Sequence, residues 1–440
     1  MIQQEKAFTV LNPNAAGIDI SSKEHFVAID PVKSKTPIRS FGSFTEDLEE
    51  LCCWLKGNTV DTVAMEATGI YWVSLFLLLQ EKGFDVILVN AKHLKNVRGK
   101  KTDVQDAEWI RQLHSCGLLR GSFQPDLQTR ELRCYLRHRS NLIGTSADSI
   151  RLMQKAFEQM NIKLHNVISD ITGKTGRLII EAILQGERNP ETLASFGDKR
   201  IRQTKKPDMV KSLTGIWKEE HIFELKQAYS TFNFNQQLIE ECDAEIDKLL
   251  RKMANTNRDS SKINRSTKTN KNNLNYEVKD TLEDLLGTDL SEIYGLSPTT
   301  ITEIISEVGV DMSKWATSKH FTSWLNLCPN NKISGGKILK SKRDRKKNKA
   351  SQVFKLAANS VIRSKHWLSA FYHKIKLRRG AGKAIVATAR KIAIIFYEMI
   401  SRKEAFKPLD VERYNNLAIE RRVKALEKNA KSLGYSLQML

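Results

Sequence analysis

The feature that most constrains the fold is an acidic residue inside a short, strongly apolar stretch. Asp19 alternates with Ile18 and Ile20, a polar turn covers residues 21–24, and a second apolar run covers residues 26–29. Short β-branched runs bounded by turn residues predict a hairpin of two buried strands. A carboxylate inside such a strand is costly unless a cation pairs with it. Asp19 therefore predicts a nearby cation.

The charge of the chain restricts its partners. Its 440 residues include 71 Lys and Arg against 50 Asp and Glu, and this net charge of +21 is spread along most of the sequence. Such a surplus favours a polyanionic partner, with nucleic acid ahead of a membrane surface. The six cysteines form no CxxC pair and no Cys/His metal spacing, which argues against a zinc site or a disulfide framework.

The apolar pattern argues against a membrane protein. The N-terminus lacks the apolar core of a signal peptide, and the longest apolar runs, near residues 71–79 and 392–400, are too short to span a bilayer. We therefore expect a soluble, cytoplasmic protein with no membrane partner.

The N-terminal part alternates between strand and helix patterns. After the hairpin we expect a strand within residues 37–44, helices over 46–56 and 70–82, and buried strands over 61–64 and 84–90. Strands and helices alternating at these lengths predict an α/β domain with a partly parallel sheet.

Three further acids accompany this pattern. Glu66 ends one predicted strand, and a capping-box sequence at residues 102–105 starts a helix near Asp103. Asp103 and Asp106 then share one helix face. Acids in a first helical turn also favour the helix dipole without any metal, so each acid alone is unremarkable. Together with Asp19 they are four carboxylates at the ends of different elements, which can hold one or two Mg²⁺ ions as a ribonuclease-H-like nuclease domain requires.

The middle of the chain is helical and basic. Helical spacing extends over residues 126–203 and again over 223–254, and the segment 255–275 is a polar linker. Two long amphipathic helices around shorter ones predict either an antiparallel coiled-coil arm for self-association or an ordinary helical bundle, and spacing alone leaves both open.

The last part contains two motifs. Residues 290–309 predict a helix, a tight turn at Gly295 and a second helix, a hairpin that can present backbone amides to a phosphate. Further on, Ser334 precedes two glycines in a segment, 332–349, with nine basic residues and one acid. No activating base stands beside Ser334, so the local chemistry alone indicates a loop serine rather than a catalyst.

Several blocks resemble one known family. The sequences EATGIYW (66–72), VNA (89–91) and GKKTDVQDAEWI (99–110) closely resemble the DEDD insertion-sequence transposases of the IS-one-ten family. The Ser-Gly-Gly-Lys motif at 334–337 and the segments 383–400 and 426–435 are also similar to family members. The resemblance implies an N-terminal RNase H-like (RuvC-like) α/β domain, a helical coiled-coil linker and a mostly helical C-terminal transposase domain.

The resemblance also implies roles for individual residues. Asp19, Glu66, Asp103 and Asp106 would be the catalytic, Mg²⁺-binding quartet, and Ser334 the catalytic serine that attacks the phosphodiester. Basic residues near these motifs are the expected nucleic-acid contacts. They are Lys100, Lys101, Lys337, Lys340, Lys342, Arg343 and Arg345.

The expected partners are donor DNA, target DNA and a structured guide (bridge) RNA, the last implied by the resemblance alone. We expect a homo-oligomer, a dimer or a tetramer, associated with the nucleoid of a prokaryotic cell. The expected parts are a RuvC-like domain (1–125), a helical or coiled-coil region (126–280), a transposase domain (281–405) and a helical tail (406–440).

Three alternatives stay open from the sequence. The first is a metal-dependent, structure-specific DNA endonuclease of the junction-resolvase kind, in which Ser334 is structural. The second is a site-specific DNA invertase with the same architecture. The third is a non-enzymatic nucleic-acid-binding relic whose acids only cap helices.

Overall fold

The structure is a computed structural model that describes residues 9–90, 102–256, 271–329, 331–341, 348–408 and 410–436. The chain separates into two compact units, Met1–Gln124 and Pro125–Leu440. The four-part division expected from the sequence stays a prediction. Within the described residues, no helix combines the length and apolar character that crossing a membrane requires.

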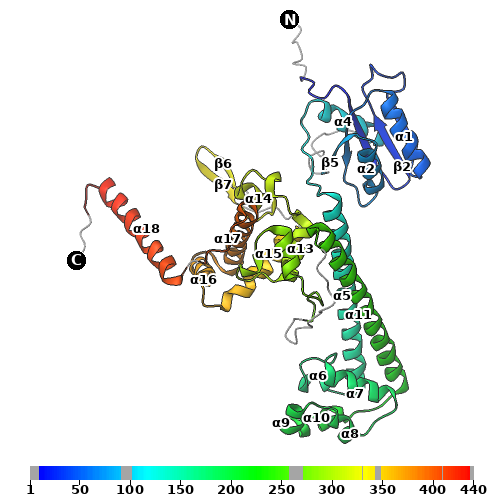
Figure 1. Cartoon of the computed structure of the whole chain (residues 1–440), viewed down its shortest axis with the longest axis vertical. Helices are drawn as coiled ribbons and strands as arrows, with labels where there is room; N and C mark the ends of the chain where they lie inside the picture. Colours follow the sequence, from blue (N-terminus) through cyan, green and yellow to red (C-terminus); the bar gives the residue numbers. More distant parts are fainter. Residues whose placement is uncertain are drawn as a thin grey trace. The chain divides into compact units, whose positions relative to one another are not determined.

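The first unit is built on a five-stranded mixed sheet with the strand order β3-β2-β1-β4-β5 (Figure 1). β1 pairs antiparallel with β2 and parallel with β4, so the hairpin predicted around Asp19 is confirmed. β2 also pairs antiparallel with β3, and β4 pairs parallel with β5. The strands are β1 (Ala15–Ile20), β2 (Glu24–Ala28), β3 (Ile38–Gly42), β4 (Thr62–Glu66) and β5 (Asp85–Val89).

Helices cover both faces of this sheet. α1 (Thr45–Gly57) and α2 (Trp72–Glu81) share a core with alternate residues of the strands, including Ile18 and Met65. The intervening strand residues face α4 (Asp103–Ser115), which packs on the opposite side. The predicted α/β domain is confirmed, and a mixed sheet between helices is consistent with a ribonuclease-H-like fold.

The second unit begins with two long helices, α5 (Leu127–Gln159) and α11 (Glu219–Ala254), which run antiparallel along each other (Figure 1). Arg139 pairs with Asp243 near one end, and Gln236 Nε2 donates to Ser146 Oγ at 3.2 Å further along. Whether this pair of helices serves self-association stays a prediction.

Five short helices between α5 and α11 form what we call the end cluster. They gather around the ends of the long helices where Phe157, Ile180 and Phe232 are buried. The end cluster consists of α6 (Leu164–Val167), α7 (Lys174–Leu184), α8 (Pro190–Ser195), α9 (Lys199–Thr204) and α10 (Lys206–Leu213).

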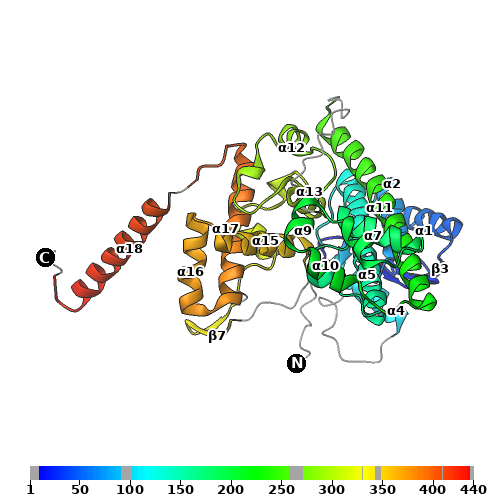
Figure 2. The ribbon, with the colours of Figure 1, turned by 90° about the horizontal axis from the view of Figure 1, so that it is seen from below.

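The remainder of the second unit is mostly helical. α17 packs against both α15 and α16 (Figure 2), and the rings of Phe354 and Phe396 meet edge to face at 5.5 Å. Its helices are α12 (Lys279–Leu286), α13 (Pro298–Val308), α14 (Ser318–Trp324), α15 (Lys349–Ser360), α16 (Trp367–Arg379), α17 (Ala381–Arg402) and α18 (Val411–Ser432), with short 3-10 turns η1 (Leu290–Glu292), η2 (Met312–Lys314) and η3 (Val361–Arg363). A separate hairpin is formed by β6 (Asn331–Ser334) and β7 (Lys337–Ser341).

Candidate active site

Two contacts define the direction in which α4 crosses the sheet. In its last turn, His114 Nε2 lies 2.9 Å from Thr62 Oγ1, at the first residue of β4. In its middle, the backbone of Ala107 covers Gly17 of β1 so closely that a Cβ there would overlap the Ala107 carbonyl oxygen. α4 therefore runs antiparallel to β1 and β4, and its first turn lies toward the edge where both strands end.

Asp19 and Glu66 occupy that edge. The parallel register pairs Ile18 with Met65, so the next residues, Asp19 and Glu66, are neighbours on adjacent strands. Ile18 and Met65 point into the core under α1 and α2, and the following side chains point to the α4 face. Asp19 and Glu66 are half-buried there, and the Thr68 hydroxyl lies 3.5 Å from Glu66 Oε1.

Asp103 and Asp106 lie in the first turn of α4. The helix begins at Asp103 as predicted, because Thr102 is its N-cap and accepts a hydrogen bond from the Gln105 amide at 3.3 Å. Asp103 is exposed, whereas Asp106 is half-buried and directly precedes Ala107, which packs on β1. The two acids thus project from the turn that lies toward the Asp19 and Glu66 edge.

The four acids offer only carboxylate oxygens, the donors that a hard divalent cation prefers. Their chemistry therefore fits Mg²⁺. Within the described residues, however, no three His, Cys, Asp or Glu side chains converge closely enough to form a metal site. Asp19 and Glu66 share the edge where β1 and β4 end, and the first turn of α4 carries the other two acids toward that edge.

Ser334 lies in the second unit, at the tip of the β6–β7 hairpin. Its register partner is Lys337, and the two residues between them, Gly335 and Gly336, have φ values of 53° and 75°. Two consecutive positive φ angles are those of a type I′ turn, which glycine adopts without strain. Ser334 is exposed, and a Cβ on either glycine would meet no atom within 4 Å. The serine is therefore at a strand end on an open tip, not in an irregular loop.

Two family models match the chain. One, described as a transposase model (DEDD_Tnp_IS110), matches residues 16–162, and the other, described as Transposase IS116/IS110/IS902 family, matches residues 287–373. The chain belongs to the IS110 transposase family. No curated protein matches it. The first match spans all four acids and the second spans Ser334, and membership of the family makes the protein an enzyme that cuts and rejoins DNA.

The basic residues expected to contact nucleic acid are only partly described. Lys337 is exposed at the start of β7, and Lys340 belongs to the same strand. Lys100, Lys101, Lys342, Arg343 and Arg345 lie outside the described residues.

One motif of the transposase differs from its prediction. The prediction of a helix before Gly295 is wrong, because Leu290–Glu292 forms a single 3-10 turn. A Cβ on Gly295 would lie 2.5 Å from the carbonyl oxygen of Ala357 in α15, so this turn packs against a helix. Ser297, in turn, caps α13 by accepting a hydrogen bond from the Thr300 amide. These contacts give Gly295 a packing role and Ser297 a capping role, and neither role requires a bound phosphate.

Sequence reasoning missed the part that Gly17 plays in the transposase. The glycine adds nothing to the site chemically, but it allows α4 to approach β1 closely beside Asp19. A glycine inside a buried strand was the available signal, since such glycines often mark a close approach of backbone.

Proposed function

We propose that the transposase joins DNA strands through a composite active site. Asp19, Glu66, Asp103 and Asp106 bind Mg²⁺, and Ser334 is the nucleophile. The observation that supports this best is the antiparallel course of α4, whose first turn carries two acids toward the edge that holds the other two. Bound Mg²⁺ would stabilise the negative charge that develops on the phosphate oxygens.

The open position of Ser334 suits an attack on a bulky substrate. Its oxygen forms a bond to phosphorus while the bond from phosphorus to one DNA oxygen breaks, and the serine proton is lost as that oxygen is protonated. The phosphoserine conserves the ester bond, so the reverse attack by a DNA hydroxyl rejoins strands without an external energy source. The glycine turn beside Ser334 keeps the approach free of side chains.

The proposal includes donor DNA, target DNA and a guide RNA as partners. The net charge of +21 supports binding to more than one nucleic acid. Because the acids and the serine belong to different units, we propose that a homo-oligomer completes the site, with the serine of one subunit acting beside the acids of another.

The test is the formation of recombinant junctions in cells that carry the gene with its native flanks. Asp19→Ala and Ser334→Ala should each abolish junctions while the protein is still expressed. Asp85→Asn, at the start of β5, and Ser323→Ala, exposed in α14, are matched controls that should keep them.

The two variants distinguish the alternatives. Loss of junctions only in Asp19→Ala, with DNA cutting retained in Ser334→Ala, would identify a metal-dependent endonuclease in which the serine is structural. Junctions that persist in both variants would refute the composite site.

A further inference from the structure

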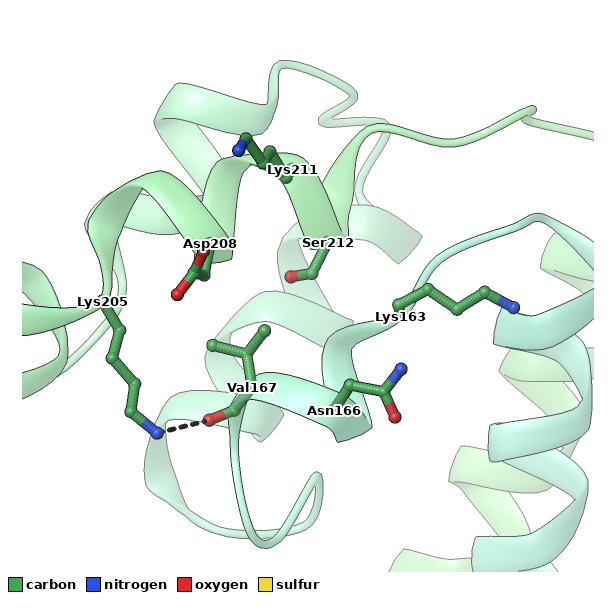
Figure 3. A pocket seen from close by; sticks show the side chains of 7 residues that line it. All are labelled: Lys163, Asn166, Val167, Lys205, Asp208, Lys211 and Ser212. Carbon is green, nitrogen blue, oxygen red and sulfur yellow. Dashed lines mark hydrogen bonds between the residues drawn. The ribbon is translucent and has the colours of Figure 1, made fainter.

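The end cluster contains a hollow that is chemically unlike the rest of its core. It has a volume of about 390 Å³ and lies between α6 and α10 (Figure 3). Three lysines line it, Lys163, Lys205 and Lys211, and Val167 is its one apolar lining residue among the described residues. Pockets for drug-like molecules are lined mostly by apolar and aromatic side chains, so this lining instead suits a charged, hydrated ligand.

The walls of the hollow are held by the fold. The Lys163 amide donates to the Ser212 carbonyl at 2.8 Å, which joins the segment before α6 to the last turn of α10. On the other side, Lys205 Nζ donates to the Val167 carbonyl at 3.3 Å, the dashed line in Figure 3. Met209 of α10 is buried in the core below. The backbone that carries the lysines is therefore anchored although their ammonium groups reach solvent.

The charges of the hollow favour an anion. Lys205 and Lys211 are exposed. Lys163 pairs with Glu158, which neutralises part of the Lys163 charge. Asp208 is the single acid of the lining, against three lysines. Ser212 and Asn166 add neutral hydrogen-bonding groups, which Figure 3 shows around the same space. The Ser212 hydroxyl already donates to the Met209 carbonyl at 2.8 Å, so Lys205, Lys211 and the Asn166 amide are the donors left for a phosphate.

Positive charge also continues past the hollow. Residues 199–211, which form α9 and most of α10, contain six Lys and Arg and one acid. α9 lies beside α10 in the end cluster (Figure 1). A small anion would need only the hollow, whereas a chain of phosphates makes use of the extended basic surface as well.

We propose that the end cluster is a nucleic-acid backbone site, in which the hollow takes one phosphate and α9 contacts its neighbours. This inference rests on the proposed function only for the choice of a nucleic acid as the polyanion. Contacts of this kind fix position without reading sequence. The end cluster would thus hold the nucleic acid at a place separate in the chain from both the acids and Ser334.

The test measures binding of the full-length protein to a duplex DNA and to a structured RNA by fluorescence anisotropy across a KCl series. The double variant Lys205→Gln/Lys211→Gln is compared with Lys226→Gln/Lys248→Gln, which removes two exposed lysines from α11. For duplex DNA, losing the one phosphate that the hollow takes should reduce the slope of log K against log salt by about 1. Lys205→Arg/Lys211→Arg should restore the slope.

The nucleic acid whose slope changes identifies the bound partner, and a change with either one supports the proposal. Equal slopes for the hollow variant and the α11 control, with both nucleic acids, would overturn it. The proposal would also be overturned if the hollow variant lost binding of inorganic phosphate while its binding of both nucleic acids was unchanged. Because binding is measured without catalysis, failure of the proposed chemistry would leave this result intact.

Discussion

Gly17 in β1 lies directly under Ala107 in α4, with no room between them for a side chain. A Cβ on Gly17 would overlap the Ala107 carbonyl oxygen and the Arg111 amide, and would lie 2.8 Å from the Arg111 Cα. All three atoms belong to a helix backbone, which cannot rotate away as a side chain can. This contact sets how closely the helix that carries Asp103 and Asp106 approaches the strand that carries Asp19.

Gly17→Ala should therefore lower the free energy of unfolding of the first unit by about 3 kcal/mol, the upper range for overpacking. DNA joining should fall with it, although no acid is changed. The matched control is Gly57→Ala at the end of α1, where an added Cβ meets nothing within 4 Å. That control should be neutral or stabilise by about 0.5 kcal/mol. Urea unfolding followed by pulse proteolysis measures both, and equal stabilities would contradict the packing of α4 on β1.

The turn beside Ser334 depends on positive φ rather than on space. Gly335 has a φ of 53°, and no atom lies within 4 Å of its added Cβ. Asn tolerates this conformation, whereas Val does not. We expect Gly335→Asn to retain most junction formation and Gly335→Val to lose it, at equal expression. If both variants behaved alike, the turn would not position the serine.

Acidic pH should destabilise the first unit through His114. The ring is 5% exposed and burial lowers its pKa below the ordinary value of 6.5, although Asp85 and Asp61 partly oppose this. The unfolded chain then binds the proton more tightly, so stability present above about pH 6.5 declines as the pH falls below it.

His114→Gln should weaken this pH dependence, as measured by pulse proteolysis in urea at pH 7.5 and pH 5.5. Some dependence should persist, because burial also lowers the pKa of His25. His138→Gln, exposed in α5, is the control and should leave the dependence unchanged. A variant at position 114 with the full wild-type dependence would show that folding does not lower the pKa of this ring.

The long helices of the second unit depend on a buried ion pair. Arg139 pairs with Asp243, and its guanidinium also donates to the carbonyls of Asn272 at 2.9 Å and Asn273 at 2.8 Å. The Arg139 and Asp243 side chains are only 5% and 1% exposed, and burial raises the pKa of the Asp243 carboxyl despite its partner.

Arg139→Met should cost about 3–5 kcal/mol, since it leaves a buried carboxylate without its cation. The double variant Arg139→Met/Asp243→Leu should recover part of this loss. In contrast, Arg151→Met breaks an exposed pair on the same helix and should cost less than about 1 kcal/mol. Urea unfolding monitored by circular dichroism tests all three, and similar costs for Arg139→Met and Arg151→Met would refute a structural role for the buried pair.

Metal binding by the acids predicts a stability change that is independent of catalysis. MgCl₂ at 100 times its dissociation constant should stabilise the wild-type first unit by about 2.7 kcal/mol. Asp19→Asn should abolish this response. Asp85→Asn should respond as the wild type does. A full response in Asp19→Asn would exclude this aspartate as a ligand.

Local patterns in the sequence were sufficient for many elements of the fold. The hairpin around Asp19 follows from alternation of period two, and the start of α4 follows from an N-cap that reaches only three residues along the chain. Both depend on neighbours in sequence. The four acids and Ser334 could be selected because they stand in long family-specific blocks, and the two family matches then confirmed the family.

The sequence by itself thus determined the strands, the long helices, the family and the identity of the candidate acids. Only the tertiary structure decided the direction of α4, the packing of Gly17 and Gly295, and the hollow between Lys163 and Lys211. The physical reason is that each of these depends on close contact between segments far apart in the chain. Side-chain periodicity shows which face of an element is buried, but not which backbone covers it.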